Sequence, residues 1–225
     1  MPRVLLFALA FPVIACADPE PPPDPPPSVR AFSGDYVPVD DGAEVPGWTA
    51  FRDSLRATLV REDTLGLLTA IAPDARLSYD TEAVGPDGFR AMWFSGDPPQ
   101  GRSPWATLAG VLDGGSLDED GAVIAPFVQA LWPDDHDPLS SVAIVETDVE
   151  ARAAPSAEAE VVATLSTLIV PALAPPDSGW RQIQLPDGQA AFVVAGQALS
   201  PLSYRATFWP DPDGTWRLRS FLAGD

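Results

Sequence analysis

Six short segments between residues 141 and 200 have the composition of β-strands, with β-branched residues and alternating apolar and polar side chains. They span residues 141–145, 149–152, 160–165, 168–170, 180–185 and 190–194. Turn-forming sequences separate them, notably at residues 175–179 and 186–189, which are rich in proline, aspartate and glycine. Short strands at such regular intervals are typical of a small, closed β-barrel.

The residues of this region also follow a defined spacing. The positions concerned are Val149, Arg152, Pro155, Ser156, Val161, Leu165, Trp180, Ile183, Asp187, Gly188, Phe192, Val193 and Leu199. This spacing resembles that of the bacterial SH3 (SH3b) family, which runs V-x-x-R-x-x-P-S and later W-x-x-V and D-G-x-x-G-[YF]-V. Ala191 departs from it, because the family usually has glycine there. If a close backbone approach requires that glycine, the strand must shift or bulge.

The resemblance implies an SH3-like β-barrel over residues 141–200. Members of the family usually act as non-catalytic binding modules, for peptidoglycan peptides or for a partner protein. Arg152, Trp180 and Phe192 are the candidate ligand-binding residues. On physical grounds, a structural role is favoured over ligand binding for each of these residues. Trp180 and Phe192 are expected in the core, and the stem of Arg152 is expected to cover that core while its charged end stays in water.

The first sixteen residues have the layout of a secretion signal. Arg3 provides a positive start, and the apolar residues 4–14 are too few for a transmembrane helix, which needs about 20. Residues 13–16, Val-Ile-Ala-Cys, resemble the lipobox of bacterial lipoproteins. The resemblance implies a signal peptide of residues 1–15 and a lipid on Cys16. The residue after Cys16 is Ala17, whereas aspartate at this position is associated with retention at the inner membrane. The protein is therefore expected at the outer membrane, facing the periplasm.

Residues 16–47 are expected to form a linker after the lipidated cysteine. Residues 19–27 hold seven prolines, interrupted only by Glu20 and Asp24. Such a run favours either an extended polyproline II stalk or simple disorder. Residues 29–47 are polar and acidic and are expected to be loosely ordered. Because Cys16 is the only cysteine, the chain has no intrachain disulfide.

The remaining segments predict a domain of residues 48–140 together with 201–225. Residues 48–72 have helical periodicity, with Asp63 as cap of a second helix that includes Ile71 and ends at Pro73. Residues 77–79 suit a short strand, residues 85–88 a turn, and Ser103 caps another helix. Residues 204–209 and 216–222 predict a hairpin. A lone hairpin is marginally stable, so it should return to the N-terminal elements. The expected fold is therefore α+β, with the barrel inserted between the N-terminal domain and this hairpin.

Two further resemblances concern this second domain. Helices followed by strands faintly resemble the NTF2-like fold, with no motif to support it. The tail resembles a pattern of uncharacterised bacterial lipoproteins, Y-R-A-x-F … G-x-W … F-x-A-G-D. The matching residues are Tyr204, Arg205, Ala206, Phe208, Gly214, Trp216, Phe221, Ala223, Gly224 and Asp225.

The formal net charge of −19 restricts the partners of this chain. Such acidity disfavours nucleic acid and disfavours electrostatic attachment to anionic lipid. Membrane attachment is therefore assigned to the lipid anchor on Cys16.

Catalytic groups are sparse in the sequence. His136, the only histidine, is either a general base or metal ligand, or part of a solvated loop, and the loop is favoured. Asp80 and Glu82 are the least implausible acidic pair for glycoside hydrolysis. A second acidic cluster, at residues 118–120, suits a loop surface. Trp93, Trp105, Phe127 and Trp132 either line a ligand pocket or pack in the core, and core packing is favoured.

The sequence thus predicts a non-catalytic, lipid-anchored protein of the cell envelope with an SH3-like binding module, without cofactor or metal. Its expected partners are the membrane and either peptidoglycan or an envelope protein. The alternative is an envelope-polymer hydrolase, with a catalytic site in the N-terminal domain and the barrel as its targeting module.

Overall fold

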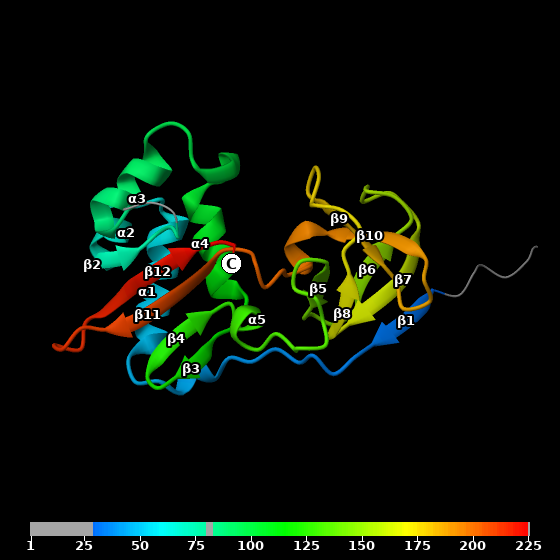
Figure 1. Ribbon diagram of the computed structural model, residues 1–225, viewed down its shortest axis with the longest axis horizontal. Helices are drawn as coiled ribbons and strands as arrows, with labels where there is room; N and C mark the ends of the chain where they lie inside the picture. Colours follow the sequence, from blue (N-terminus) through cyan, green and yellow to red (C-terminus); the bar gives the residue numbers. More distant parts are fainter. Residues whose placement is uncertain (1–28, 80–82, 225) are drawn as a thin grey trace, which may run out of the picture.

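The computed structural model describes residues 29–79 and 83–224. The fold is a mixed α+β arrangement in two lobes, with helices and one sheet in the first and strands alone forming most of the second (Figure 1). We call them the helical lobe and the strand lobe. The chain passes between the lobes at residues 34–40, 131–140 and 198–204. The signal peptide, Cys16, the proline run and the Asp80–Glu82 pair of the sequence analysis lie outside the described residues.

The helical lobe contains a five-stranded sheet in the order β2-β12-β11-β4-β3. Its strands are β2 (Ile71–Arg76), β3 (Leu117–Glu119), β4 (Ala122–Ala125), β11 (Arg205–Pro210) and β12 (Trp216–Leu222). β12 runs parallel to β2, and β11 runs antiparallel to β4. The C-terminal hairpin therefore forms the middle of a sheet whose other strands precede residue 141. Its return to the N-terminal elements is seen in these pairings.

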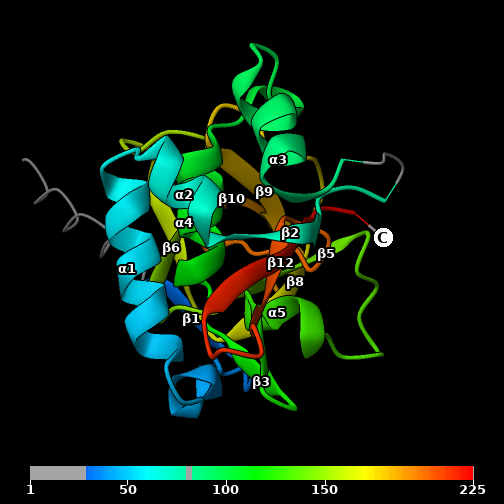
Figure 2. The same cartoon turned by 90° about the vertical axis from the view of Figure 1, so that its left-hand side faces the viewer.

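Helices cover one face of this sheet, as Figure 2 shows. They are α1 (Trp48–Val60), α2 (Thr64–Ala70), α3 (Gly85–Phe94) and α4 (Pro104–Asp113), and a short α5 (Phe127–Ala130) follows β4. Single 3-10 turns occur at Asp41–Glu44, Pro99–Gly101 and Ala195–Gln197. The caps predicted at Asp63 and Ser103 are confirmed, because their side chains accept the backbone N–H groups of Gly66 and Ala106.

Three predictions for this lobe differ from the structure. Ile71 does not extend the second helix but begins β2, where it pairs with Leu218 of β12. Pro73 is tolerated there because β2 is an edge strand, which leaves one row of backbone groups without partners. Residues 77–79, predicted to be a short strand, are not a strand in the structure and follow the end of β2 at Arg76. Residues 85–88 open α3 instead of forming an isolated turn, with Pro86 in the first helical turn.

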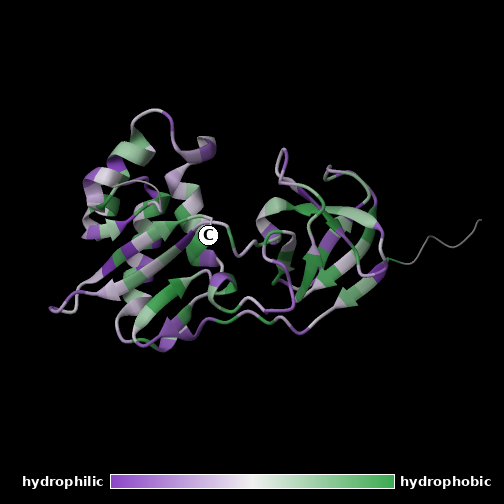
Figure 3. Ribbon diagram, viewed as in Figure 1, coloured by the Kyte–Doolittle hydropathy of each residue, from purple (hydrophilic) through white to green (hydrophobic). Residues whose placement is uncertain are grey.

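The core of the helical lobe lies between its helices and its sheet. Hydrophobic and hydrophilic residues alternate along β11 and β12 (Figure 3), so one face of each strand turns toward the helices. Trp48 of α1 is fully buried and its ring lies 4.8 Å from that of Phe208 and 5.5 Å from that of Trp216. Phe89 and Phe221 form a second aromatic contact in the same core.

All six strand segments predicted between residues 141 and 200 are strands in the structure. They are β5 (Ser141–Ile144), β6 (Val149–Arg152), β7 (Val161–Ser166), β8 (Leu168–Pro171), β9 (Trp180–Gln184) and β10 (Ala190–Val194). They form a sheet in the order β1-β7-β6-β10-β9 and a separate pair, β5-β8. Both sheets contribute to one core, which includes Ile144, Val170, Ile183 and Val193.

A closed barrel is not formed by these strands, in contrast to the prediction. The chain leaves the larger sheet at Thr167, which has a φ of 49°, and β8 then pairs with β5. The free edge of β7 is occupied by β1 (Arg30–Ser33), which runs parallel to it. The two sheets share a core but no continuous backbone ladder, and Ala172 forms an isolated bridge with Ile183 between them. The result is two packed sheets around one small core.

β1 also corrects the expectation that residues 29–47 are loosely ordered. Its four residues pair with residues 163–166, and Phe32 packs against the strand-lobe core. Arg30 forms an ion pair with Asp187, and its Nη2 donates to the side-chain oxygen of Gln189 at 2.7 Å. The segment before the helical lobe is thus part of the strand lobe, and it covers an edge that would otherwise expose backbone groups.

Candidate functional site

The sequence-predicted residues Arg152, Phe192 and Trp180 lie on neighbouring strands of the larger sheet. In the ladder, Phe192 of β10 is directly opposite Arg152 of β6 on one side and Gln182 of β9 on the other. Directly opposed residues share a face of the sheet. Trp180 lies two residues before Gln182 in the same strand, so it is on that face as well.

This face is the outer one, and the core expectation for Trp180 and Phe192 is therefore wrong. Ile183, Ala191 and Val193 alternate with them and are fully buried on the inner face, whereas Trp180 and Phe192 are half-buried. Strand alternation allows only one of the two sets to face inward. β9 and β10 pair without a register shift past Ala191, so alanine replaces the family glycine there without a bulge in that ladder.

A groove of about 280 Å³ lies over this face. Trp180, Gln182 and Phe192 line it from the sheet, and Pro155 lines it from the loop after β6. The loop between β8 and β9 supplies Ala174, Pro175, Asp177 and Ser178. The groove combines two aromatic side chains and two proline rings with a carboxylate and a hydroxyl. Apolar walls with few polar groups are typical of sites that bind small ligands or short peptide segments.

Arg152 lies beside the groove and does not line it. Its Nη1 donates to the backbone oxygen of Ala159 at 2.7 Å, and its Nη2 forms an ion pair with Glu150. The side chain is 18% exposed, in agreement with a stem that covers the sheet. Arg152 therefore positions the loop of residues 153–160, from which Pro155 reaches the groove.

Gln182, Pro155, Pro175, Asp177 and Ser178 were missed as candidate residues. The alternation of residues 180–185 placed Gln182 on the same face as Trp180, and this was the available signal. The loop residues gave none, because the turn-forming sequence at residues 175–179 predicts a turn but not which strand it folds over.

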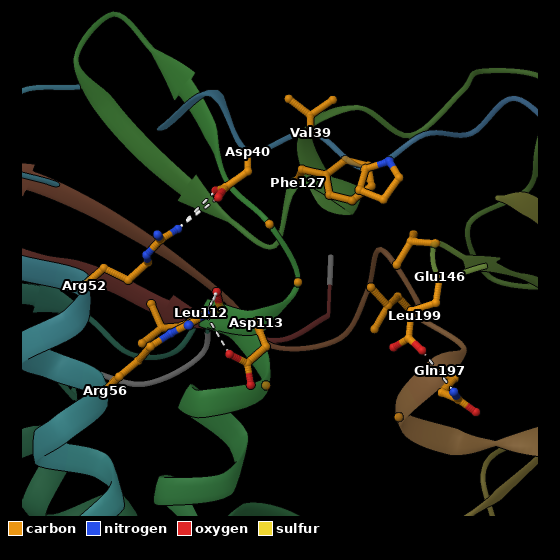
Figure 4. Close-up of a pocket in the computed structure, with 16 residues that line it drawn as sticks. Val39, Asp40, Arg52, Arg56, Leu112, Asp113, Phe127, Glu146, Gln197 and Leu199 are labelled. Carbon is orange, nitrogen blue, oxygen red and sulfur yellow. Dashed lines mark hydrogen bonds and ion pairs between the residues drawn. The ribbon is translucent and has the colours of Figure 1, made fainter. Parts of the chain in front are cut away.

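A second hollow, of about 520 Å³, separates the two lobes. Figure 4 shows Arg52 pointing to Asp40 and Arg56 pointing to Leu112 and Asp113, with Glu146, Gln197 and Leu199 opposite them. Arg52 Nη1 is 3.0 Å from Asp40 Oδ2, and Arg56 Nη2 is 2.6 Å from Asp113 Oδ1. The arginines of this interlobe cleft are thus already paired with carboxylates of the same chain.

The carboxyl of Asp40 anchors one side of that cleft. Burial raises the pKa of Asp40, but the hydrogen bonds from Ser116 and Arg52 and the charges of Arg52 and Arg56 outweigh this effect. The pKa of Asp40 consequently lies below its ordinary value. Asp40 remains ionised at neutral pH and keeps α1 attached to the segment that enters from the strand lobe.

The other candidate groups of the sequence analysis have structural contacts. His136 lies in the loop after α5, where its backbone oxygen accepts the indole N–H of Trp132 at 2.8 Å. Asp118 caps the β3–β4 turn by accepting the N–H of Gly121. Within residues 29–79 and 83–224, no three histidine, cysteine, aspartate or glutamate side chains come together in a way that could hold a metal ion.

The four aromatic residues considered as pocket linings are distributed over several clusters. Trp93 is buried in the helical-lobe core, and Trp105 is half-buried against Phe94. Phe127 and Trp132 pack around Tyr36, with ring distances of 5.6 and 6.1 Å. Burial raises the pKa of Tyr36 to about 12. Only Phe127 reaches the interlobe cleft, at its edge.

The helices of the described residues are too short or too polar to span a bilayer. In comparisons with known proteins, no family model matches the chain, and neither a curated protein nor a solved structure shows significant similarity to it.

Proposed function

We propose that the protein is a lipid-anchored protein of the cell envelope, whose strand lobe is an SH3-like, non-catalytic binding module. The observation that carries this proposal is the groove over β9 and β10, which displays Trp180 and Phe192 on the outer face of the sheet. Tryptophan and phenylalanine side chains are enriched at binding surfaces relative to the rest of a protein surface.

The groove suits a short peptide segment better than a large flat surface. Its volume of about 280 Å³ holds a few residues, and the aromatic and proline rings offer apolar contacts. Asp177 at its rim would pair with an amine of the ligand. Peptides of peptidoglycan and an exposed segment of an envelope protein both fit this description, and nucleic acid is disfavoured by the net charge of −19.

Replacing Trp180 or Phe192 with alanine should weaken retention on purified sacculi, or on the envelope protein that binds, at least about tenfold. The measurement is a pull-down with the soluble protein on sacculi and on envelope extract, followed by titration with muropeptides. Trp209→Ala is the matched control, because Trp209 is 47% exposed on the helical lobe, away from the groove. If both groove variants bind as well as the control, the groove is not the binding site. Recovery of one envelope protein, without retention on sacculi, would identify that protein and not peptidoglycan as the ligand.

The lipid anchor is proposed from the lipobox-like residues 13–16. Cys16→Ser should abolish incorporation of labelled fatty acid and leave an unprocessed precursor in the membrane fraction, because serine lacks the thiol that carries the lipid. The matched control is Ala17→Ser, which keeps the cysteine and should be labelled as the parent protein is. Undiminished labelling of Cys16→Ser would place the lipid elsewhere or exclude it.

The hydrolase alternative receives no comparable support. A general acid at neutral pH needs a raised carboxyl pKa. Among the described residues, the carboxyl groups with a resolved shift, Asp40, Asp137, Glu158 and Asp213, all have their pKa lowered.

A further inference from the structure

A third hollow between the lobes lies against α4, and it differs from the interlobe cleft in its charge. It consists of two adjoining depressions of about 320 and 160 Å³. Both are lined by Arg102, Pro176, Arg181, Ser200, Ser203 and Tyr204. Arg102 precedes α4 in the helical lobe, Arg181 belongs to β9 in the strand lobe, and the other polar residues lie on the segment that connects the lobes. No aspartate or glutamate lines either depression.

Arg181 is held in this hollow without a carboxylate partner. Its Nη1 makes one long hydrogen bond, 3.4 Å, to the backbone oxygen of Ala174, and its Nε is buried without a partner among the described residues. Burial alone lowers the pKa of Arg181. Arg181 as a whole is half-buried, and burying even part of a guanidinium without an opposite charge is unfavourable.

Arg102 adds a second positive charge to the same space. Its Nε donates to the side-chain oxygen of Gln100 at 2.9 Å, and the ion pairs of the described residues do not include it. Burial raises the pKa of Tyr204, and the charge of Arg102 partly opposes this effect. Arg102 and Tyr204 line the same two depressions. What distinguishes Arg102 and Arg181 from the other arginines is that both line the same two depressions, whose lining contains no carboxylate among the described residues.

We infer that this hollow binds a small oxyanion, or the anionic end of a larger ligand, between the guanidinium groups of Arg102 and Arg181. Guanidinium groups bind carboxylate and phosphate oxygens through paired N–H donors. The hydroxyls of Ser203 and Tyr204 line the same space and supply neutral donors. Because one arginine comes from each lobe, the bound anion also links the lobes. This inference is independent of the groove over β9 and β10.

The test uses the full chain, solubilised in detergent, and two probes, inorganic phosphate and succinate, at constant ionic strength. We expect one of them to raise the Tm in a saturable manner, whereas chloride does not. The probe that saturates at lower concentration distinguishes a phosphoryl from a carboxylate ligand. Arg102→Gln and Arg181→Gln should each raise the apparent Kd at least tenfold above that of the parent protein. For each variant, the shift is measured from its own Tm without anion.

Arg90→Gln is the matched control, because it removes the same charge from an exposed arginine of α3 and should keep the parent Kd. Arg181→Lys retains charge without the paired donors and should lie between the parent and Arg181→Gln. If circular dichroism shows that Arg181→Gln is unfolded, Arg181→Lys and Arg102→Gln provide the test. The inference is overturned if neither probe gives a saturable shift, or if the shift persists in the folded glutamine variants.

Discussion

Trp48→Ala should lower the free energy of unfolding of the helical lobe by about 3–5 kcal/mol, as expected when a buried aromatic side chain leaves a cavity. Trp48 is fully buried at the start of α1, where its ring contacts Phe51, Phe208 and Trp216. These partners come from the same helix and from both strands of the returning hairpin. Since domains are stable by only about 5–15 kcal/mol, this loss is a large part of the total.

The measurement is urea unfolding followed by far-UV circular dichroism, which reports on the helices. Thr49→Ala is the matched control on the next residue of α1, and it should change the free energy of unfolding by less than about 0.5 kcal/mol because Thr49 is exposed. If Trp48→Ala lowers the free energy of unfolding by less than about 1 kcal/mol, the aromatic cluster does not stabilise the packing of α1 on the sheet.

The two lobes differ in how far local sequence determines them. Strong alternation in residues 180–194 predicted two strands and the turn between them, and the structure confirms both. It did not tell which face turns inward, since both faces carry large apolar side chains, Trp180 and Phe192 on one and Ile183 and Val193 on the other. The choice depends on what packs against the sheet, and here β5 and β8 cover the side of Ile183.

Elements that depend on distant partners were harder to predict. β2 reads as the end of a helix followed by Pro73, and it becomes a strand because β12, from the far end of the chain, pairs with it. β1 reads as part of an acidic linker, and it becomes a strand because β7 has a free edge. The barrel prediction failed for the same reason: local patterns predict strands, but sheet closure depends on which edges pair.

The candidate sites show the same division. The groove residues Trp180 and Phe192 were identified from their spacing within one short region. Arg102 and Arg181 are far apart in the sequence, and they line one hollow only because the two lobes lie side by side. No local sequence pattern predicts such a pair.

Phe208→Asp should unfold the helical lobe and leave the strand lobe folded. Phe208 is fully buried in the middle of the sheet, so the variant loses aromatic packing and places a carboxylate in an apolar core. Together these costs exceed about 5 kcal/mol, a loss that a domain of ordinary stability does not survive. The strand lobe has its own core of buried residues, separate from that of the helical lobe, and should keep its structure.

Limited digestion with trypsin resolves the two lobes, because the chain has arginines in both and no lysine. Cleavage at Arg52 of α1 and Arg217 of β12 should be at least tenfold faster in Phe208→Asp, while Arg152 and Arg181 stay protected. Trp209→Asp adds the same charge to the neighbouring residue on the opposite, exposed side of β11, and its digestion should match that of the parent protein. Equal acceleration at Arg152 and Arg181 would show that the lobes unfold as one unit. In that case the anion hollow and the interlobe cleft would be parts of a single cooperative structure, since the strand lobe would depend on its contacts with α4 and α1.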